Sequence, residues 1–503
     1  MSSRINLVWL LAAAAAGPYA AAPRIVIDGR FDDWVGVEPT PVDGPLGLTA
    51  LTTLDDPGAL YLRLDFAREV LLQGLDEPVR LLLDADDNPV TGRTVSGFAG
   101  ADVAVVFSPA EARGISVLRW GTGEEAGEEL TSYALGLVAA PTYAAARIEL
   151  RLERGDLPVL GRLFAGSGVR GVLTSVAGAA PSAAFRHAFA TAVAPEPRTL
   201  RESASVTRAS GTELRVLSWN VAGESLLRQA ALFRRMLTAL APDLVLLDEV
   251  PAGVTASDLL PLFADLIGRD RRGWEILVGD GGGRQHGVVA SRHDLKRLPA
   301  LERVPYPEGF PAWLQTVDRS WIRDDLAGAE EDGVSAFGAL LGLPDLRLAV
   351  ATLDLQCCGR PGDPEERIRE IQAEALRGAL LAVRGAGPDA LIVAGDLNLV
   401  GGRGPLDLLR LGTGPQGGDL EVVDALQLDG LSAATWGFSG EFPPSRLDYF
   451  LLSAETLEVL RAFAFDSRDL APRERDALGL RRRDSHAASG HLPLVVDVRR
   501  RRR

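Results

Sequence analysis

The stretch Leu391-Ile-Val-Ala-Gly-Asp-Leu-Asn398 contains the pattern that predicts the fold of the C-terminal half of this chain. Its apolar residues predict a buried strand, and two polar residues, Asp396 and Asn398, follow where that strand ends. The same order occurs upstream, where Glu249 closes Leu244-Val-Leu-Leu-Asp-Glu249. Polar groups gathered at strand ends are the usual place for a site in an α/β protein. The stretch therefore predicts an α/β domain with a polar site at one edge of a sheet.

Strands and amphipathic helices alternate on both sides of this stretch. Strands are expected at 214–218, 244–247, 346–353, 391–394, 447–452 and 492–498, and helices at 227–240 and 364–383. Such alternation is typical of a layered α/β domain, which we place at 213–499.

The segment before this domain has a different pattern. Residues 23–195 contain short strand-like runs separated by Gly, Asp, Asn and Pro, which predict a β-sandwich module. Clear examples are 60–66, 79–83, 103–107 and 147–152. Residues 196–212 show no hydrophobic period and are interpreted as a linker.

The first 22 residues have the pattern of a secretory signal peptide. Arg4 precedes an apolar run from Leu7 to Ala16, and small residues follow at Ala20 to Ala22. The pattern predicts export to the periplasm or the medium, with an uncleaved N-terminal anchor as the alternative. No later run of eighteen apolar residues occurs, so we expect no membrane span after the signal.

Composition limits the classes of partner. The 503 residues carry a formal net charge of −15, which argues against a broad electrostatic grip on nucleic acid but not against a local basic groove. Cys357 and Cys358 are adjacent and are the only cysteines, so no disulfide framework is expected.

Six polar residues flank the apolar strands of the C-terminal half: Asn220, Glu249, Asp396, Asn398, Asp448 and His491. Carboxylate and amide oxygens are the ligands that Mg²⁺ prefers. Taken singly, each residue has a simpler explanation. A Gly-Asp-x-Asn sequence is a common strand exit, and Asp448 has Arg446 nearby as a salt-bridge partner.

The order of the motifs is more specific than any single residue. Together they resemble the motif set of the endonuclease/exonuclease/phosphatase superfamily, which includes DNase I. The motifs are Ser218-Trp-Asn220, Asp248-Glu-Val250, Gly395-Asp-Leu-Asn398, Arg446-Leu-Asp-Tyr-Phe-Leu-Leu452 and Gly490-His-Leu-Pro493. The resemblance implies a DNase I-like, four-layered α/β sandwich, in which two sheets face each other with helices outside.

The resemblance also implies roles for these residues. Glu249 would bind an essential Mg²⁺ or Mn²⁺, with Asn220 nearby as a ligand or phosphate contact. Asp396 would orient or deprotonate the attacking water, and Asn398 would hydrogen-bond the phosphate. His491 would contact a phosphate oxygen, and Asp448 would orient a neighbouring catalytic group.

The chain departs from the family pattern at three positions. Gly490 stands where a carboxylate usually precedes the histidine and helps to hold it. Asp354 stands where many members carry another histidine, although it can instead serve as a ligand of a second metal. Asp248 replaces a usual glutamine, and we expect no consequence from this change. The first two departures predict weakened turnover.

Two further segments contain candidate ligands. Gly281 to Arg292 resembles the family strand beside the active site, which places Gln285, His286 and Arg292 near the substrate, with His286 as a candidate for the missing histidine. In the N-terminal half, the segments 27–34 and 82–92 resemble β-sandwich modules related to family-nine carbohydrate-binding domains. There, the alternating Asp84, Asp86 and Asn88 predict a Ca²⁺ site, with a hairpin turn rich in Asx residues as the alternative.

The function indicated is that of a secreted, metal-dependent phosphoesterase that hydrolyses phosphodiester bonds, with an endonuclease as one form. Its substrate would be a nucleic acid, a phospholipid head group or a sugar phosphate. The alternative is a catalytically weakened surface or binding protein, which uses the β-sandwich module to recognise a glycan or a partner.

Overall fold

The computed structural model describes residues 25–501, except 111–113, 122–126, 158–160, 165, 178–180, 191, 193–204, 267–272, 439 and 441. The expected signal peptide at 1–22 and much of the expected linker at 196–212 lie outside the described residues. In the described part of the chain, no helix is both long and apolar enough to cross a membrane.

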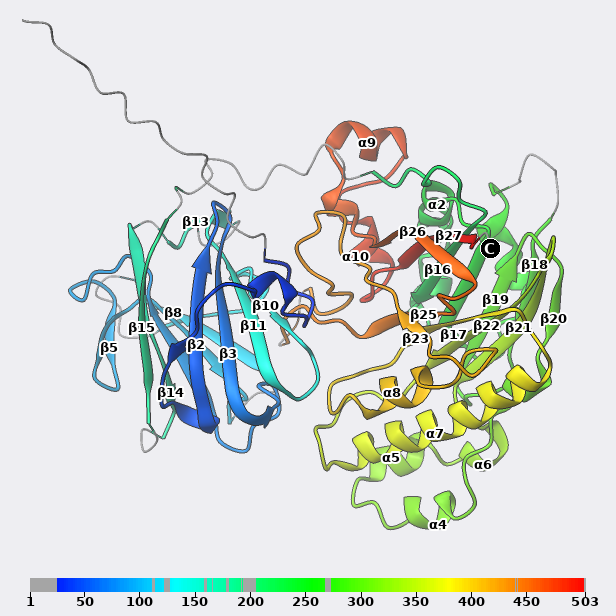
Figure 1. Cartoon of the computed structure of the whole chain (residues 1–503), viewed down its shortest axis with the longest axis horizontal. Coiled ribbons are helices and arrows are strands. Elements are labelled where there is room, and N and C mark those ends of the chain that lie inside the picture. The colour runs from blue at the N-terminus through cyan, green and yellow to red at the C-terminus, as the bar shows by residue number, and fades with distance from the viewer. Residues whose placement is uncertain are drawn as a thin grey trace, which may run out of the picture.

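Within the described residues, the N-terminal region is built from antiparallel strands (Figure 1, blue to cyan). One sheet has the order β1 (Thr40–Pro41), β2 (Leu48–Asp55), β3 (Ala59–Val70), β11 (Ala145–Glu153) and β10 (Val138–Ala140). The other has the order β15 (Ala183–Ala188), β14 (Gly168–Ser175), β4 (Val79–Asp84), β7 (Val103–Phe107), β8 (Ile115–Arg119) and β9 (Glu128–Leu130). Small pairs are formed by β5 (Arg93–Val95) with β6 (Phe98–Ala101) and by β12 (Asp156–Leu157) with β13 (Gly161–Arg162).

The two larger N-terminal sheets share one hydrophobic core. Alternate residues of a strand face the same side, so Leu60, Leu62 and Leu64 of β3 are buried in the same cluster as Leu81 and Leu83 of β4.

The C-terminal region contains a second pair of sheets in the described residues (Figure 1, green to red). The first has the order β18 (Glu275–Val278), β19 (Gln285–Ser291), β17 (Leu244–Pro251), β16 (Leu214–Asn220), β27 (Leu494–Arg500) and β26 (Leu457–Ala464). The second has the order β20 (Leu295–Arg297), β21 (Ala336–Leu343), β22 (Leu346–Asp354), β23 (Ala390–Asp396), β25 (Asp448–Leu452) and β24 (Glu421–Val422). Pairing is parallel between β16 and β17 and between β22 and β23.

A buried cluster joins these two sheets, with Val216 and Leu246 from the first and Val350 and Ile392 from the second. Helix α2 (Ala230–Leu240) packs on the other face of the first sheet, and α7 (Pro364–Gly385) packs on the other face of the second. The remaining helices are α1 (Ser225–Arg228), α3 (Ala256–Leu259), α4 (Phe310–Leu314), α5 (Ser320–Asp325), α6 (Ala329–Asp332), α8 (Gly404–Arg410), α9 (Pro472–Ala477) and α10 (Asp484–Ala488). Short 3-10 helices span η1 (Asp32–Trp34), η2 (Pro45–Gly47), η3 (Leu260–Phe263), η4 (Pro299–Leu301) and η5 (Ser467–Asp469).

The expected strands of the C-terminal half coincide with β16, β17, β22, β23, β25 and β27 to within a few residues. One expected helix differs. The helix predicted over 227–240 is divided into α1 and α2, because Gln229 lies between them outside the helical conformation, with φ −113° and ψ 21°.

The N-terminal region contacts loops of the C-terminal region directly. The backbone of Ile27 donates to Leu431 O at 3.0 Å and accepts from Ala433 N at 3.1 Å. Ala144 N donates to Gly401 O at 2.7 Å. The strand exit that follows β23 and the loop that precedes β25 are therefore held against the N-terminal sheets.

Candidate active site

Strand direction brings the polar residues of the C-terminal half to one edge. The parallel strands β16, β17, β22 and β23 end at this edge, and the antiparallel strands β25 and β27 begin there. In the registers, Asn220 lies opposite Asp248, and Asp396 lies between Asp354 and Asp448.

Three carboxylates at this edge form a compact cluster. Glu249, Asp354 and Asp396 each offer an oxygen, and the three oxygens lie within 4.8 Å of one another. A bulge between Leu247 and Val250 interrupts β17, and Glu249 takes a positive φ of 55° there. Bulges of this kind redirect a side chain beside a site. The local backbone strain thus turns Glu249 toward the second sheet.

Three amide side chains hold these carboxylates in place. Asn220 Nδ2 donates to Glu249 Oε1 at 2.8 Å and to Asp396 Oδ2 at 3.2 Å, while its Oδ1 accepts from Ala222 N. Gln285 Nε2 donates to the second oxygen of Glu249 at 3.0 Å. Asn398 Nδ2 donates to Asp354 Oδ1 at 3.4 Å and to Leu355 O at 2.9 Å, and the backbone N–H of Asn398 donates to Asp396 Oδ1 at 2.8 Å.

A histidine lies on the other side of Asp396. His491 Nδ1 lies 2.9 Å from Asp448 Oδ2, and Nε2 lies 3.7 Å from Asp396 Oδ2. Thr435 Oγ1 donates to the same oxygen of Asp448 at 2.5 Å and accepts from the backbone N–H of Asp448 at 3.1 Å. Asp448 thus supplies a carboxylate partner to a histidine that Gly490 leaves without an adjacent one.

Burial and like charges shift the pKa values of these groups. Burial raises the pKa of Asp354 well above its ordinary range, and the charge of Glu249 adds to this rise. Burial also raises the pKa of Asp396 to about 7, although the nearby His491 opposes the rise. Burial alone would lower the pKa of His491, but the carboxylates of Asp448 and Asp396 raise it to about 10. The imidazolium form is therefore favoured between the carboxylates.

Asp248 adds a further carboxyl group behind the cluster. It is 1% exposed, and neither carboxylate oxygen has a hydrogen-bond partner among the described residues. Burial raises its pKa, followed by the charge of Asp354. The edge therefore crowds together more carboxyl groups than one imidazole can balance if all are ionised, and a bound cation would favour their ionised forms.

Two of the residues expected near the substrate do not face the carboxylates: His286 lies at this end of β19 but on its other face, and Arg292 lies beyond the far end. Gly287 and Val289 face the space between the sheets, so alternation places His286 on the opposite face of β19, where Val288 packs. Arg292 follows the far end of β19 and pairs with Asp243 at 3.0 Å. At about 3.3 Å per residue, that end lies roughly 20 Å from Gln285. The prediction assigned the whole of β19 to the site, but only the face that carries Gln285, at the start of the strand, reaches the carboxylates.

In the N-terminal region, Asp84, Asp86 and Asp102 offer oxygens that lie within 4.8 Å of one another. The expected third residue, Asn88, is engaged in local hydrogen bonds. Its side-chain oxygen accepts from Val90 N, and its backbone N–H donates to Asp84 Oδ1. Asp102, which sequence reasoning did not select, takes its place in the cluster. Asp102 lies outside the segment 82–92, and the pairing of Leu83 with Val103 brings it beside Asp84.

Two residues of the C-terminal edge were also missed. Thr435 precedes Trp436 in the loop before β25, and a threonine there carries no metal or acid–base signature. No consequence was expected from Asp248, because the sequence does not show that the second sheet covers it. In the fold its side chain is buried next to Glu249.

Comparisons with known proteins agree with this architecture. The sequence model of the Endonuclease/Exonuclease/phosphatase family matches residues 217–470, just over half of the chain. A search of curated proteins returned no match.

Solved structures show more distant likenesses. D. rerio TDP2 complexed with a single-strand DNA product is 18% identical, with 57% of this chain and 98% of that chain covered, and a TM-score of 0.36. The human Nocturnin catalytic domain with bound sulfate is 17% identical, with 57% and 94% covered and a TM-score of 0.35. An AP endonuclease from Archaeoglobus fulgidus is 13% identical, with 56% and 98% covered and a TM-score of 0.35. The match to the family model, over half of the residues, shows that the chain belongs to the Endonuclease/Exonuclease/phosphatase family.

Proposed function

We propose that this protein is an exported, metal-dependent phosphoesterase that hydrolyses phosphodiester bonds at the edge formed by β16, β17, β22, β23, β25 and β27. The observation that carries the proposal is the placement of Glu249, Asp354 and Asp396 beside the Asp448–His491 pair. Family membership supports a phosphoesterase, and the geometry favours one that uses a divalent cation.

The donor set fits Mg²⁺ or Mn²⁺. Both ions prefer oxygen ligands, and Mg²⁺ is usually held by one or two carboxylates. Glu249, Asp354 and Asp396 would hold the ion, and Asn220 positions two of these carboxylates through its amide. When bound, the cation supplies charge neutralisation at the phosphate and lowers the pKa of a water molecule. Asp354, in place of the histidine of many family members, would therefore contribute to metal binding rather than act as an acid.

The protein side chains would divide the remaining work. Asp396 would orient the attacking water and accept its proton. Asn398 would present its amide to a phosphate oxygen. His491, with its pKa raised to about 10, would place a positive charge against the charge that develops on the phosphate. Asp448 would hold the imidazole in position through Nδ1.

The proposal includes three candidate classes of substrate and export from the cell. A nucleic acid and a phospholipid head group carry a phosphodiester bond, whereas a sugar phosphate carries a phosphomonoester bond and would make the protein a phosphatase. The net charge of −15 favours a substrate that does not depend on a broad basic surface. We assign residues 213–499 to the catalytic α/β domain with its four layers, 196–212 to the linker, and 23–195 to a β-sandwich module that follows a signal peptide at 1–22.

The test is release of product from DNA, sphingomyelin and bis-nitrophenyl phosphate with Mg²⁺ or Mn²⁺. The proposal expects turnover of at least one of these by the wild type, and loss of that turnover in Glu249→Ala and Asp396→Ala and after chelation of the metal. Wild-type rates equal to those of both variants on every substrate would contradict it. That outcome would favour a binding protein that has lost catalysis, because Asp354 replaces the usual histidine.

A further inference from the structure

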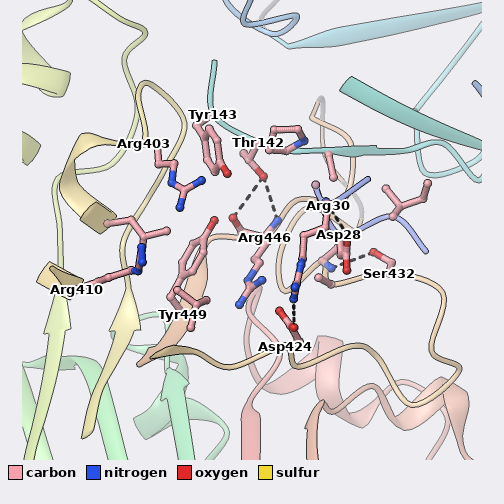
Figure 2. A pocket seen from close by; sticks show the side chains of 18 of the residues that line it. Asp28, Arg30, Thr142, Tyr143, Arg403, Arg410, Asp424, Ser432, Arg446 and Tyr449 are labelled. Atoms are coloured by element: carbon pink, nitrogen blue, oxygen red, sulfur yellow. Dashed lines mark hydrogen bonds and ion pairs between the residues drawn. The ribbon is translucent and has the colours of Figure 1, made fainter. Parts of the chain in front are cut away.

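A cavity of about 610 Å³ lies between the N-terminal sheets and the outer face of the second C-terminal sheet. It is separate from the catalytic edge, because Tyr449 lines it while the preceding residue, Asp448, faces His491. Alternation along β25 sends these two side chains to opposite faces of the sheet. Thr142 closes the cavity from the N-terminal side, where its hydroxyl contacts the backbone of Arg446 (Figure 2).

One end of this cavity gathers hydrogen-bond donors. Figure 2 shows the hydroxyls of Tyr143 and Tyr449 and the guanidinium of Arg403 pointing toward the same space. Tyr449 is only 4% exposed as a whole residue and lines the cavity, into which its hydroxyl points (Figure 2). A phenol hydroxyl both donates and accepts hydrogen bonds, so this group is suited to bind a polar ligand atom in the cavity.

Four arginines and five carboxylates line the cavity as a whole, and the arginines differ in how closely a carboxylate pairs with them. Arg446 lies over the ring of Tyr449, 4.5 Å from its centroid, and donates to Val423 O, but it forms no ion pair with a described residue. Arg403 pairs through Nε alone with Asp407 at 3.4 Å, and half of its side chain is exposed. The other two arginines that line the cavity are matched, since Arg30 pairs with Asp424 and Arg410 lies 3.8 Å from Asp419.

The other end is suited to hydroxyl groups. Figure 2 places Asp28, Ser432 and the Arg30–Asp424 pair there, away from Arg403. A carboxylate, a hydroxyl and a neutralised ion pair recognise alcohols by hydrogen bonding without demanding a net charge.

We propose that this cavity between the domains binds a small phosphomonoester with a hydroxylated body, such as a pentose phosphate. The phosphate lies between Arg403, Tyr143 and Tyr449, because guanidinium and phenol donors match its oxygens. The hydroxylated body extends toward Asp28 and Ser432. The volume is within the range of sites for small molecules. The bound ligand contacts both domains and fixes the Arg446 segment that leads into Asp448.

The test is calorimetric titration of the full chain with ribose 5-phosphate in the presence of EDTA, so that no metal at the catalytic edge contributes. We expect one binding event per chain. Arg403→Gln and Tyr449→Phe should each weaken it by about tenfold or more, as expected when a charge-assisted hydrogen bond is lost. Arg367→Gln, an exposed arginine on α7 paired with Glu370, is the matched control and should leave the affinity unchanged.

The controls separate this site from the catalytic edge and from general phosphate binding. Glu249→Gln should bind ribose 5-phosphate as the wild type does. Ribose and inorganic phosphate, titrated alone, should each bind more weakly than ribose 5-phosphate. The proposal is overturned by an absence of binding, by an unchanged affinity in Arg403→Gln, or by loss of binding in Glu249→Gln. Inorganic phosphate that binds as tightly as ribose 5-phosphate would overturn the role of the hydroxylated end. Arg403→Gln decides the matter even if Tyr449→Phe is poorly folded, because Arg403 is half exposed.

Discussion

Among the described residues, two clusters of three carboxylates each bring their oxygens within 4.8 Å of one another, one in each region, and they differ in how their charges are satisfied. At the C-terminal edge, the partners of Glu249, Asp354 and Asp396 are mainly neutral amides, apart from the one imidazole of His491. In the N-terminal cluster, Arg170 forms an ion pair with Asp84, and Asp102 accepts from Ala85 N at 2.8 Å. Thr91 and the backbone of Asn88 donate to Asp86.

The difference shows what separates a metal site from an acidic turn. A cluster whose charges already have an arginine and local backbone N–H groups gains little from a cation, and a cation must first displace the arginine. A cluster with surplus charge and amide scaffolding gains a great deal. We therefore favour the C-terminal edge as the cation site, and the hairpin turn rich in Asx residues as the interpretation of the N-terminal cluster.

The largest effect expected is on turnover. Asp396→Asn should lower the rate of hydrolysis of bis-nitrophenyl phosphate by roughly 10³-fold, because it removes both a metal ligand and the group that accepts the proton. Initial rates with Mn²⁺ check this. Asp389→Asn is the matched control, since Asp389 is exposed and immediately precedes the opposite end of β23, and it should keep the wild-type rate. Equal loss in both variants would mean that the effect is structural.

The second effect concerns the buried carboxyl group of Asp248, which has no hydrogen-bond partner among the described residues. Asp248→Leu should raise the free energy of unfolding in EDTA by about 1–3 kcal/mol, because it replaces a buried carboxyl group that has no partner with an apolar side chain. Chemical denaturation followed by fluorescence measures this change. A destabilised Asp248→Leu protein would show that the carboxyl group is satisfied in solution, and would remove the contrast between the clusters.

The third effect tests the histidine side of the edge. Thr435→Val should lower turnover by roughly tenfold, the usual scale for a residue that orients a catalytic group through another. Thr435→Ser should restore most of the rate, because it keeps the hydroxyl that donates to Asp448. Steady-state kinetics should show the loss in kcat with little change in KM. A serine variant as slow as the valine variant would point to packing rather than to the hydroxyl.

The smallest effect belongs to the N-terminal cluster and depends on pH. Burial, followed by the charges of Asp86 and Asp84, raises the pKa of Asp102 from 3.8 to about 6. Because the folded pKa lies above the unfolded value, the stabilisation from Asp102 is present below about pH 4 and is lost as the pH rises through 6.

Asp102→Asn should therefore raise the melting temperature at pH 8, on the order of 2 °C, and leave it nearly unchanged at pH 4. Thermal scans at both pH values, with and without Ca²⁺, check this. If Ca²⁺ stabilises the wild type at pH 8 and Asp102→Asn abolishes that effect, the N-terminal cluster is a cation site after all.

The strands and the main residues of the edge were predictable because their signals are local. Val245 and Leu247 face one side of β17 and Leu244 and Leu246 the other, so the strand is apolar on both faces, as a strand between two layers must be. The polar residue that closes such a strand is visible in the sequence, which is how Glu249 and Asp396 were found.

The remaining features depend on contacts between segments far apart in the sequence. The partner of His491 could not be read from the adjacent Gly490, because it comes from a different sheet. The same holds for Thr435, whose role exists only once β25 brings Asp448 beside it. His286 was misplaced because the sequence does not show which face of β19 points between the sheets. The cavity at Tyr449 needs both domains and leaves no mark in either half alone.

The most direct measurement is the binding of Mn²⁺ to the full chain, followed by the loss of the electron paramagnetic resonance signal of the free ion. The wild type and Asp84→Asn should bind Mn²⁺ with the same affinity, whereas Glu249→Gln should bind it at least tenfold more weakly, as expected when one carboxylate ligand of a hard cation is lost. Binding that survives Glu249→Gln and disappears in Asp84→Asn would place the cation in the N-terminal cluster and contradict the assignment of the catalytic edge.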